Sequence, residues 1–329
     1  MNKKIVFFGT PEFASAQLEN IIQSGFDVVA VVTAPDKPAG RGKKIQQSDV
    51  KQTALKHGIE VLQPEKLKDL AFLKQLADLQ ADVFVVIAFR MLPEQVWQMP
   101  LSGTFNLHAS LLPAYRGAAP INRAIMNGEK TTGLTTFFID EKIDEGQIID
   151  QITIEIGDNE TAGELHDRMV EIGKPLVINT LQSIFSKSIV PVQQYALWNS
   201  NEIIPTAPKI FKQDCIIQWN RPMNEIINQI RGLSPYPAAF TTLSNENGEK
   251  LELKIFKAIS IEEKINTNSF KLITDHKTYF MIAMDGGCIS FLEVQQAGKR
   301  AMSISEFLRG TPMNGNWFIQ QPNTALQNQ

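Results

Sequence analysis

Three polar side chains in the middle of the chain have the types and spacing that acyl-group chemistry needs. Asn106 and His108 are two residues apart, so an extended segment would place both on one face, with Phe105 and Leu107 on the other. Asp144 follows a second apolar run and is expected at the same sheet edge. An amide can hold a carbonyl oxygen, an imidazole can donate to it, and a carboxylate can orient the imidazole or a water. On spacing alone, a hydrogen-bonded strand end explains the pattern equally well.

The N-terminal part of the chain alternates strand and helix signals, which predicts an α/β fold. Strands are expected at 4–9, 27–33, 82–88, 133–139 and 146–156, and helices at 12–24, 48–57, 67–79, 121–126 and 161–185. Strand, helix and strand within about 30 residues form a βαβ unit. Only Gly9 stands where a G-x-G-x-x-G fingerprint would be needed, so the sequence disfavours NAD and FAD.

The last third of the chain changes character after an aperiodic stretch at 187–208, which is expected to be a connector. Strands are expected at 215–219, 238–243, 251–259, 270–274, 279–284 and 288–294, and helices at 222–231 and 303–309. Several short strands joined by Asn, Gly and Asp turns predict a small barrel or sandwich. The polar tail after Trp317 is expected to be frayed.

Residues 35–44 interrupt the α/β pattern with two prolines, two glycines and four cations. This composition predicts a solvated loop without a regular element. An ordinary surface loop is the simpler interpretation, because short basic runs are common. The alternative is an arm whose Arg41, Lys43 and Lys44 contact a phosphate or a base edge.

The whole-chain composition limits the classes of function. A length of 329 residues predicts two domains, and 43% hydrophobic with 20% charged residues is typical of a soluble globular protein. The net charge of −3 indicates no general attraction to nucleic acid or membrane. The two cysteines have no CxxC spacing, which fits a reducing cytosol, and no group has a metal-ligand spacing. The apolar run at the N-terminus is too short for a signal peptide, and no run is long enough to span a bilayer.

Longer motifs are spread over nearly the whole chain. The earlier ones are Phe-Gly-Thr-Pro-Glu-Phe at 8–13, the basic loop at 35–44, Asn-Leu-His-Ala-Ser-Leu-Leu-Pro at 106–113, Tyr-Arg-Gly-Ala-Ala-Pro-Ile at 115–121 and Asp-Glu-Lys-Ile-Asp-Glu-Gly at 140–146. The later ones are Ala-Pro-Lys-Ile at 207–210, Arg-Gly-Leu-Ser-Pro-Tyr-Pro at 231–237 and Gln-Ala-Gly-Lys-Arg-Ala-Met at 296–302. Together they resemble the methionyl-tRNA formyltransferase family, a branch of the folate-dependent formyltransferases.

This resemblance implies transfer of a formyl group from 10-formyltetrahydrofolate to the α-amino group of methionine on initiator methionyl-tRNA, without a metal. It implies a Rossmann-like catalytic domain with a mostly parallel sheet at 1–188, a linker at 189–208, and a smaller β-barrel domain at 209–329. That second domain would resemble an oligonucleotide-binding (OB) fold and bind the tRNA. We expect a cytoplasmic monomer that does not associate with a membrane.

The resemblance also implies roles for individual residues. The catalytic set is Asn106, His108 and Asp144. The folate site is Ser110, Leu111, Leu112, Pro113, Phe89, Met91 and Leu92. The tRNA contacts are Arg41, Lys43, Lys44 and Lys209. One departure stands out, because Arg90 replaces a glycine that many members carry in a longer segment. The resemblance therefore says least about this wall of the folate pocket.

Two other functions are compatible with parts of the pattern. A formyltransferase acting on a nucleotide-linked amino sugar shares the catalytic core, but the Pro-Ala-Gly-Arg-Gly-Lys-Lys loop argues against it. An RNA-binding protein with an inactive formyltransferase core would not need to retain Asn106, His108 and Asp144 together.

Overall fold

The computed structural model describes residues 3–39, 44–198, 203–263, 270–311, 313 and 316–320. The chain divides into two compact units, each assembled from segments that are distant in the sequence. The first unit comprises Met1–Gly117, Thr132–Ile154 and Asp167–Thr206, and the second comprises Ala118–Thr131, Glu155–His166 and Ala207–Gln329. The second unit thus includes two short segments that precede residue 167 in the chain.

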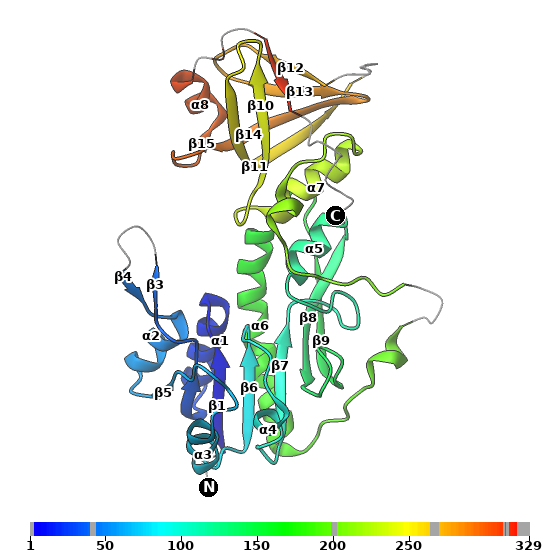
Figure 1. Ribbon diagram of the computed structural model, residues 1–329. Coiled ribbons are helices and arrows are strands. Elements are labelled where there is room, and N and C mark those ends of the chain that lie inside the picture. The colour runs from blue at the N-terminus through cyan, green and yellow to red at the C-terminus, as the bar shows by residue number, and fades with distance from the viewer. Residues whose placement is uncertain are drawn as a thin grey trace. The chain divides into compact units, whose positions relative to one another are not determined.

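The first unit is built on a seven-stranded sheet with the order β5-β2-β1-β6-β7-β8-β9 (Figure 1). Its strands are β1 (Lys4–Gly9), β2 (Asp27–Val32), β5 (Glu60–Leu62), β6 (Val83–Ile87), β7 (Thr104–His108), β8 (Thr131–Phe138) and β9 (Ile148–Glu155). The pairs from β5 to β7 are parallel, and β7 with β8 is antiparallel. This confirms the predicted α/β fold with a mostly parallel sheet.

Some of the helices of this part begin at a residue whose side chain caps their first backbone N–H groups. They are α1 (Glu12–Gln23), α2 (Asp49–Lys56), α3 (Leu70–Asp78), α4 (Glu94–Trp97) and α6 (Ala162–Ser186). Ser48 accepts from the N–H of Lys51 at the start of α2, and Asp69 accepts two N–H groups at the start of α3. Pro175 lies inside α6 as the sequence indicates.

One face of the sheet buries alternate residues of its central strands. Val6 and Phe8 of β1 lie in one apolar cluster with Phe84 and Val86 of β6 and with residues of α3. Val86 is in turn the register partner of Asn106 on β7. The strand that carries Asn106 and His108 is therefore held by a packed core, and a rigid support of this kind suits a binding site.

The basic loop departs from its prediction. The strands β3 (Lys37–Ala39) and β4 (Lys44–Gln46) pair as a short antiparallel ribbon. The prediction that residues 35–44 contain no regular element was therefore wrong. Pro38 fits this setting, because both strands of an isolated ribbon are edges and proline within a sheet is found on edge strands. Residues 40–43, with Arg41 and Lys43, lie outside the described residues, and so does the side chain of Lys44.

The second unit contains the predicted barrel. The sheet order is β12-β13-β14-β11-β10-β16, with β15 on β14, and its ladders are antiparallel. The strands are β10 (Ala239–Asn245), β11 (Lys250–Glu262), β12 (Lys271–Thr274), β13 (Phe280–Met284), β14 (Gly287–Gln296), β15 (Met302–Ser303) and β16 (Trp317–Ile319). The outermost strands β12 and β16 contact each other, which nearly closes the sheet into an OB-like barrel.

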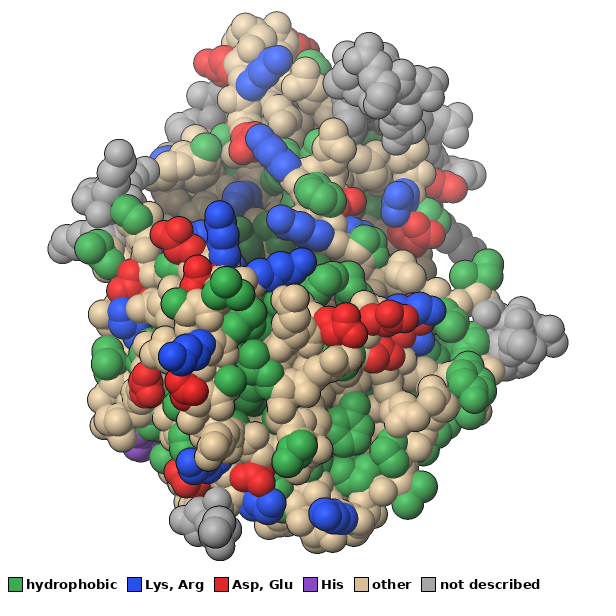
Figure 2. Space-filling model, turned by 60° about the horizontal axis from the view of Figure 1, so that its bottom comes forward, with side chains coloured by type: hydrophobic (Ala, Val, Ile, Leu, Met, Phe, Trp, Pro, Cys, Tyr) green, Lys and Arg blue, Asp and Glu red, His purple; other side chains and the backbone are tan. Residues whose placement is uncertain are grey.

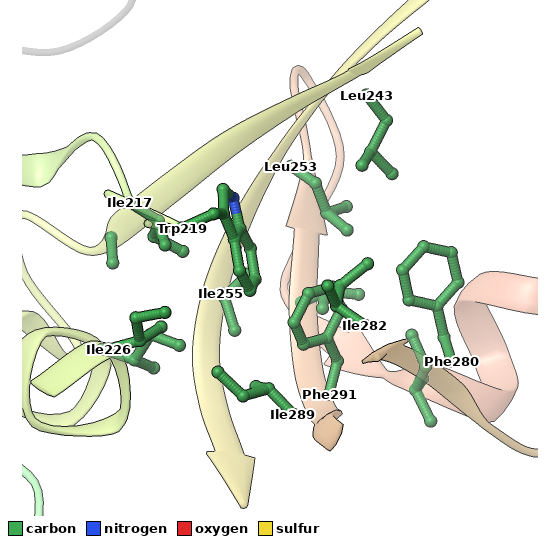
Figure 3. Packing of buried hydrophobic residues seen from close by; sticks show 14 of the residues in the cluster. Ile217, Trp219, Ile226, Leu243, Leu253, Ile255, Phe280, Ile282, Ile289 and Phe291 are labelled. Carbon is green, nitrogen blue, oxygen red and sulfur yellow. The ribbon is translucent and has the colours of Figure 1, made fainter. Parts of the chain in front are cut away.

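The barrel core is aromatic and aliphatic (Figure 3). Phe280 and Phe291 stack with ring centroids 5.2 Å apart, and Trp219 lies 6.1 Å from Phe291. The buried indole N–H of Trp219 donates to Thr241 Oγ1 at 2.9 Å, so its burial leaves no polar group unpaired. The helices of this unit are α5 (Pro120–Met126), α7 (Met223–Leu233) and α8 (Ile304–Gly310).

Two predictions for the second unit were wrong. The stretch 215–219 is not a strand: residues Lys212–Cys215 form a 3-10 helix, and Ile216 makes only an isolated bridge to Phe240. Its apolar alternation arises because Cys215, Ile217 and Trp219 fill the barrel core from an irregular segment. Phe318 and Ile319, expected to belong to a frayed tail, instead pair with β10 as part of β16, while residues 321–329 lie outside the described residues.

No helix among the described residues is long and apolar enough to cross a membrane. On the face drawn in Figure 2, Lys and Arg side chains are interspersed with Asp and Glu side chains. That mixture agrees with a net charge of −3 and with the lack of a general polyanion signal in the composition.

Candidate active site

Strand β7 positions the first two candidate residues. Phe105 and Leu107 are buried, as the alternation predicts, while Asn106 is half-buried and His108 is 7% exposed. Residues two apart on a strand project from the same face, about 7 Å from each other along the chain. Asn106 and His108 thus form one short polar row in an otherwise apolar strand.

The two ring nitrogens of His108 have different surroundings. Nε2 lies 2.9 Å from the backbone oxygen of Tyr115, which can only accept, so Nε2 carries the hydrogen. Nδ1 faces Asp144, at 3.8 Å from Oδ2. The ring also packs edge-to-face on Phe137, with centroids 6.5 Å apart. The Tyr115 carbonyl therefore fixes the orientation of the imidazole and leaves Nδ1 as the nitrogen available for chemistry.

Asp144 is held by its backbone and by one N–H group. Its φ of 55° is left-handed, a conformation that non-glycine residues adopt rarely. The Oδ2 atom accepts from the N–H of Gly117 at 2.9 Å, and 14% of the side chain is exposed. Two residues on, a Cβ at Gly146 would lie within bonding range of the Phe138 carbonyl oxygen, so only glycine fits there. A glycine at position 146 is thus a geometric requirement of this loop.

The side-chain amide of Asn106 has no hydrogen-bond partner among the residues that the structure describes. Its N–H groups are free to bind an oxygen of a ligand. The structure therefore brings His108 and Asp144 close together, with an available amide donor two residues before His108 on the same strand. A donor pair beside a carboxylate can stabilise negative charge on an oxygen and relay a proton.

Residues 110–113 form a hydrogen-bonded turn in which most of the side chains are buried. The hydroxyl of Ser110 donates to a backbone oxygen at 2.6 Å, and Leu112 and Pro113 are buried, with a cis peptide bond between them. The buried hydroxyl of Thr135 accepts from the N–H of Leu112 at 3.1 Å and donates to the carbonyl of Ser110 at 2.7 Å. Leu111 alone of the four is half-buried. Any contribution of the other three to a ligand site must therefore come from the backbone shape that they fix.

The segment after β6 separates into buried and exposed members. Phe89 packs on Phe8 with centroids 5.8 Å apart, and Leu92 is buried in the same cluster, whereas Met91 is 67% exposed. Arg90 turns its guanidinium to the carbonyls of Pro64 and Glu65, at 2.5 and 2.8 Å. Those two hydrogen bonds fix the direction of this long side chain.

Sequence reasoning missed Gln194, which lies in the stretch 189–208 predicted to be a linker. It is 2% exposed and hydrogen-bonds to the backbone of the Asp144 loop and to the side chain of Arg116. A polar residue in a segment without periodicity gives no signal of burial.

Lys209, predicted to contact tRNA, is an exposed residue of the second unit, with its Nζ 5.8 Å from the ring of Phe211.

The two cysteines do not have the surroundings of a reactive nucleophile. Burial raises the pKa of both Cys215 and Cys288, which disfavours the reactive thiolate. Among the described residues no group of three or more His, Cys, Asp and Glu could hold a metal ion.

Comparison with known families decides the classification. Residues 3–181 match the family described as formyl transferase, and residues 209–312 match the formyl transferase C-terminal domain. The chain belongs to the formyl transferase family. The motifs at 106–113 and 140–146 of this formyl transferase fall inside the first match, and those at 231–237 and 296–302 fall inside the second.

Relatives of this formyl transferase share about half of its residues. The protein named methionyl-tRNA formyltransferase in Bacteroides thetaiotaomicron is 47% identical over 93% of this chain and 95% of its own. The protein of the same name in Flavobacterium johnsoniae is 50% identical over 93% of this chain and 96% of its own.

Solved structures show the same fold at lower identity. WlaRD, a sugar 3N-formyl transferase solved in the presence of dTDP and 5-N-formyl-THF, matches with a TM-score of 0.64 and 24% identity over 91% of this chain and all of that one. The N-formyltransferase from Helicobacter canadensis, in complex with folinic acid and dTDP-3-aminofucose, gives a TM-score of 0.61 and 24% identity over 90% of this chain.

Proposed function

We propose that this protein transfers the formyl group of 10-formyltetrahydrofolate to the α-amino group of methionine on initiator methionyl-tRNA. The relatives that support an RNA-linked acceptor are 47% and 50% identical over 93% of the chain, whereas the solved sugar formyltransferase is 24% identical. The observation that carries the proposal is the pairing of His108 with Asp144 beside the available amide of Asn106.

The reaction makes three demands on these side chains. The neutral amine must form a bond to the formyl carbon while the bond from that carbon to the folate nitrogen breaks. Negative charge that develops on the formyl oxygen must be stabilised. One proton must leave the attacking nitrogen and reach the departing nitrogen, so that atoms and charge balance over the transfer.

We propose that Asn106 and His108 bind the formyl oxygen and stabilise the negative charge that develops on it. The free amide of Asn106 can donate to it, and Nδ1 of His108 can donate when the ring is charged, because the Tyr115 carbonyl already binds Nε2. One such donor is typically worth about 3 kcal/mol of transition-state stabilisation. Two preorganised donors on one strand would need no rearrangement as the charge develops.

We propose that Asp144 guides the transfer of the proton from the amine to the folate nitrogen. Its carboxylate lies 3.8 Å from Nδ1 of His108, too far for a direct hydrogen bond but near enough for one water to bridge the two side chains. The same carboxylate can order a water that carries the proton from the amine to the folate nitrogen. Alignment of the two substrates would supply much of the remaining acceleration.

We propose that Met91 and Leu111 present apolar side chains to the folate, and that Phe89 and Leu92 support this site from the core beneath the sheet edge. Ser110, Leu112 and Pro113 would contribute through the backbone turn that they fix, since their side chains face the protein interior. An exposed methionine adapts to flat apolar ligands, which fits a folate ring system.

We propose that Arg41, Lys43 and Lys44 contact the acceptor end of the tRNA and that Lys209 contacts its phosphate backbone. Backbone contacts by cations release counterions, so tRNA affinity should fall steeply as salt is raised. The protein is proposed to act as a monomer in the cytoplasm.

The decisive experiment compares acceptors at one concentration of 10-formyltetrahydrofolate. Charged initiator methionyl-tRNA, charged elongator methionyl-tRNA and a nucleotide-linked amino sugar are each incubated with the protein, and the formylated product is measured. We expect fast formylation of the initiator alone. Preference for the amino sugar would replace the proposed acceptor, and no product with any acceptor would remove the enzymatic assignment.

The role of the basic loop has its own test. Arg41→Leu should reduce formylation of initiator methionyl-tRNA far more than hydrolysis of formyl-folate in the absence of tRNA, because the side chain is proposed to contact only the tRNA. Lys68→Leu, which removes an exposed cation elsewhere in the first unit, is the matched control. Equal losses in both reactions for Arg41→Leu would indicate a defect in folding and contradict the assignment.

A further inference from the structure

Gln194 uses the full hydrogen-bonding capacity of its side chain on the loops around the candidate active site. It opens the 3-10 helix Gln194–Leu197 and is 2% exposed. Its Nε2 atom donates to the carbonyls of Asp144 and Gly146, each at 2.8 Å. Its Oε1 atom accepts from Nε and Nη2 of Arg116 at 3.0 and 2.7 Å. An amide offers two N–H groups and one oxygen with two lone pairs, and all of them are occupied.

The two bonds to carbonyls act on the backbone of the catalytic carboxylate. The carbonyls of Asp144 and Gly146 flank Glu145, so binding both fixes the loop on either side of that residue. Asp144 has a left-handed φ of 55°, which an unrestrained aspartate would seldom keep. Just before Gln194, Val192 exchanges two backbone hydrogen bonds with Ile148, at 2.8 and 2.9 Å, and so anchors the segment that delivers Gln194.

The two bonds to Arg116 act on the segment that holds both site side chains. Immediately before Arg116, the carbonyl of Tyr115 accepts from His108 Nε2 at 2.9 Å. Immediately after it, the N–H of Gly117 donates to Asp144 Oδ2 at 2.9 Å. Arg116 also pairs with Glu145, with Nη1 at 3.3 Å from Oε1. One buried amide therefore joins the backbone loop of Asp144 to the segment that orients the imidazole and the carboxylate.

We propose that Gln194 is a positioning residue for formyl transfer, which sets the distance between His108 Nδ1 and Asp144 Oδ2 without touching substrate. This inference rests on the proposed function, and it gives the stretch 189–208 a catalytic purpose beyond joining two domains. A residue of this kind should affect turnover through Asp144, whereas a residue that only stabilises the fold should affect the melting temperature.

Two variants of Gln194 and one control distinguish its hydrogen bonds to the Asp144 loop from those to Arg116. Gln194→Leu removes both pairs of hydrogen bonds. Gln194→Glu keeps an oxygen for Arg116 but places a second oxygen against the carbonyls of Asp144 and Gly146. It therefore breaks only the hydrogen bonds to these carbonyls, and the volume of the side chain hardly changes. Gln193→Glu makes the same chemical change at the exposed neighbouring residue and is the matched control. If Gln194→Leu does not fold, Gln194→Glu carries the test.

The assay measures kcat and KM for 10-formyltetrahydrofolate with saturating initiator methionyl-tRNA, together with the melting temperature. We expect Gln194→Leu and Gln194→Glu to lower kcat by about 100-fold, the usual effect of displacing a catalytic group by about 1 Å. KM for the folate should change little, because no substrate contact is lost. Gln193→Glu should behave as the wild type.

A double-mutant cycle with Asp144→Asn provides the readout that a purely structural role would not give. If Gln194 acts by placing the carboxylate, Gln194→Leu should lower the rate of an Asp144→Asn protein by only a few-fold. A full 100-fold loss in that background as well would overturn the inference, as would wild-type turnover in both Gln194 variants. A wild-type protein that does not formylate methionyl-tRNA would instead overturn the proposed function, and this inference with it.

Discussion

Replacement of Asp144 by asparagine isolates the charge of the candidate carboxylate. Asparagine has nearly the same shape and keeps an oxygen that can accept from the N–H of Gly117, now 2.9 Å from Oδ2. The loop geometry should therefore survive, because the Gly117 bond and the carbonyl bonds from Gln194 do not need the charge. What disappears is the negative charge 3.8 Å from Nδ1 of His108.

The expected loss of turnover can be worked from that distance. Two unit charges at 3.8 Å attract by about 4 kcal/mol at an effective dielectric constant of about 20. The two side chains are 8% and 14% exposed, so water screens them only in part. Because the Gly117 N–H already neutralises part of the carboxylate charge, we expect kcat to fall by about 10²–10³-fold, within the range for acid–base groups.

The assay is steady-state formylation of initiator methionyl-tRNA, with 10-formyltetrahydrofolate binding measured separately by fluorescence or calorimetry. Asp144→Asn should bind the folate as the wild type does, because its effect is on the transfer step. Asp150→Asn, an exposed aspartate on β9, is the charge-matched control and should retain wild-type turnover. Wild-type turnover in Asp144→Asn, or an equal loss in the control, would refute the reasoning.

Two further predictions concern the stability of the two units. Phe291→Ala should cost about 3–5 kcal/mol in unfolding of the barrel, as a fully buried ring between Trp219 and Phe280 leaves a cavity; denaturant unfolding checks this, and an unchanged midpoint would contradict the packing described. Asp82 accepts hydrogen bonds from Lys3 Nζ and the Lys4 N–H, which hold its pKa below the usual range. A lowered folded pKa contributes stability above the unfolded value of about 3.9 that is lost as pH falls through the folded value. Asp82→Asn should therefore be less stable than the wild type in urea at pH 7, by a difference that shrinks as the pH is lowered, and a gap that does not shrink with acid would contradict this.

The fold was predictable wherever burial imposes a period on the sequence. The run 82–88 was predicted as a central strand because its apolar residues are continuous, and β6 spans Val83–Ile87 with every residue buried. Asn106 and His108 could be placed on one face because Phe105 and Leu107 mark the other. The stretch 215–219 shows the limit of this reasoning, since Cys215, Ile217 and Trp219 alternate because they enter the barrel core, without a ladder to pair with.

The remainder of the candidate site depends on backbone atoms and on turns. The acceptor for His108 Nε2 is the carbonyl of Tyr115, and the donor to Asp144 is the N–H of Gly117; neither is encoded by side-chain type. Gln194 could not be found for a related reason. Its partners are two carbonyls and Arg116, which come together only once β8, β9 and the following segment have folded.

The most direct test of the proposed chemistry is single-turnover formylation by His108→Ala beside the wild type. Both proteins are loaded with 10-formyltetrahydrofolate and mixed with excess initiator methionyl-tRNA, and formylmethionyl-tRNA is followed in time. If His108 stabilises the developing oxygen charge through Nδ1, the rate should fall by at least about 10²-fold while folate affinity stays within a few-fold. A variant that retains the melting temperature and the wild-type single-turnover rate would contradict the assignment of His108 and the paired role of Asp144.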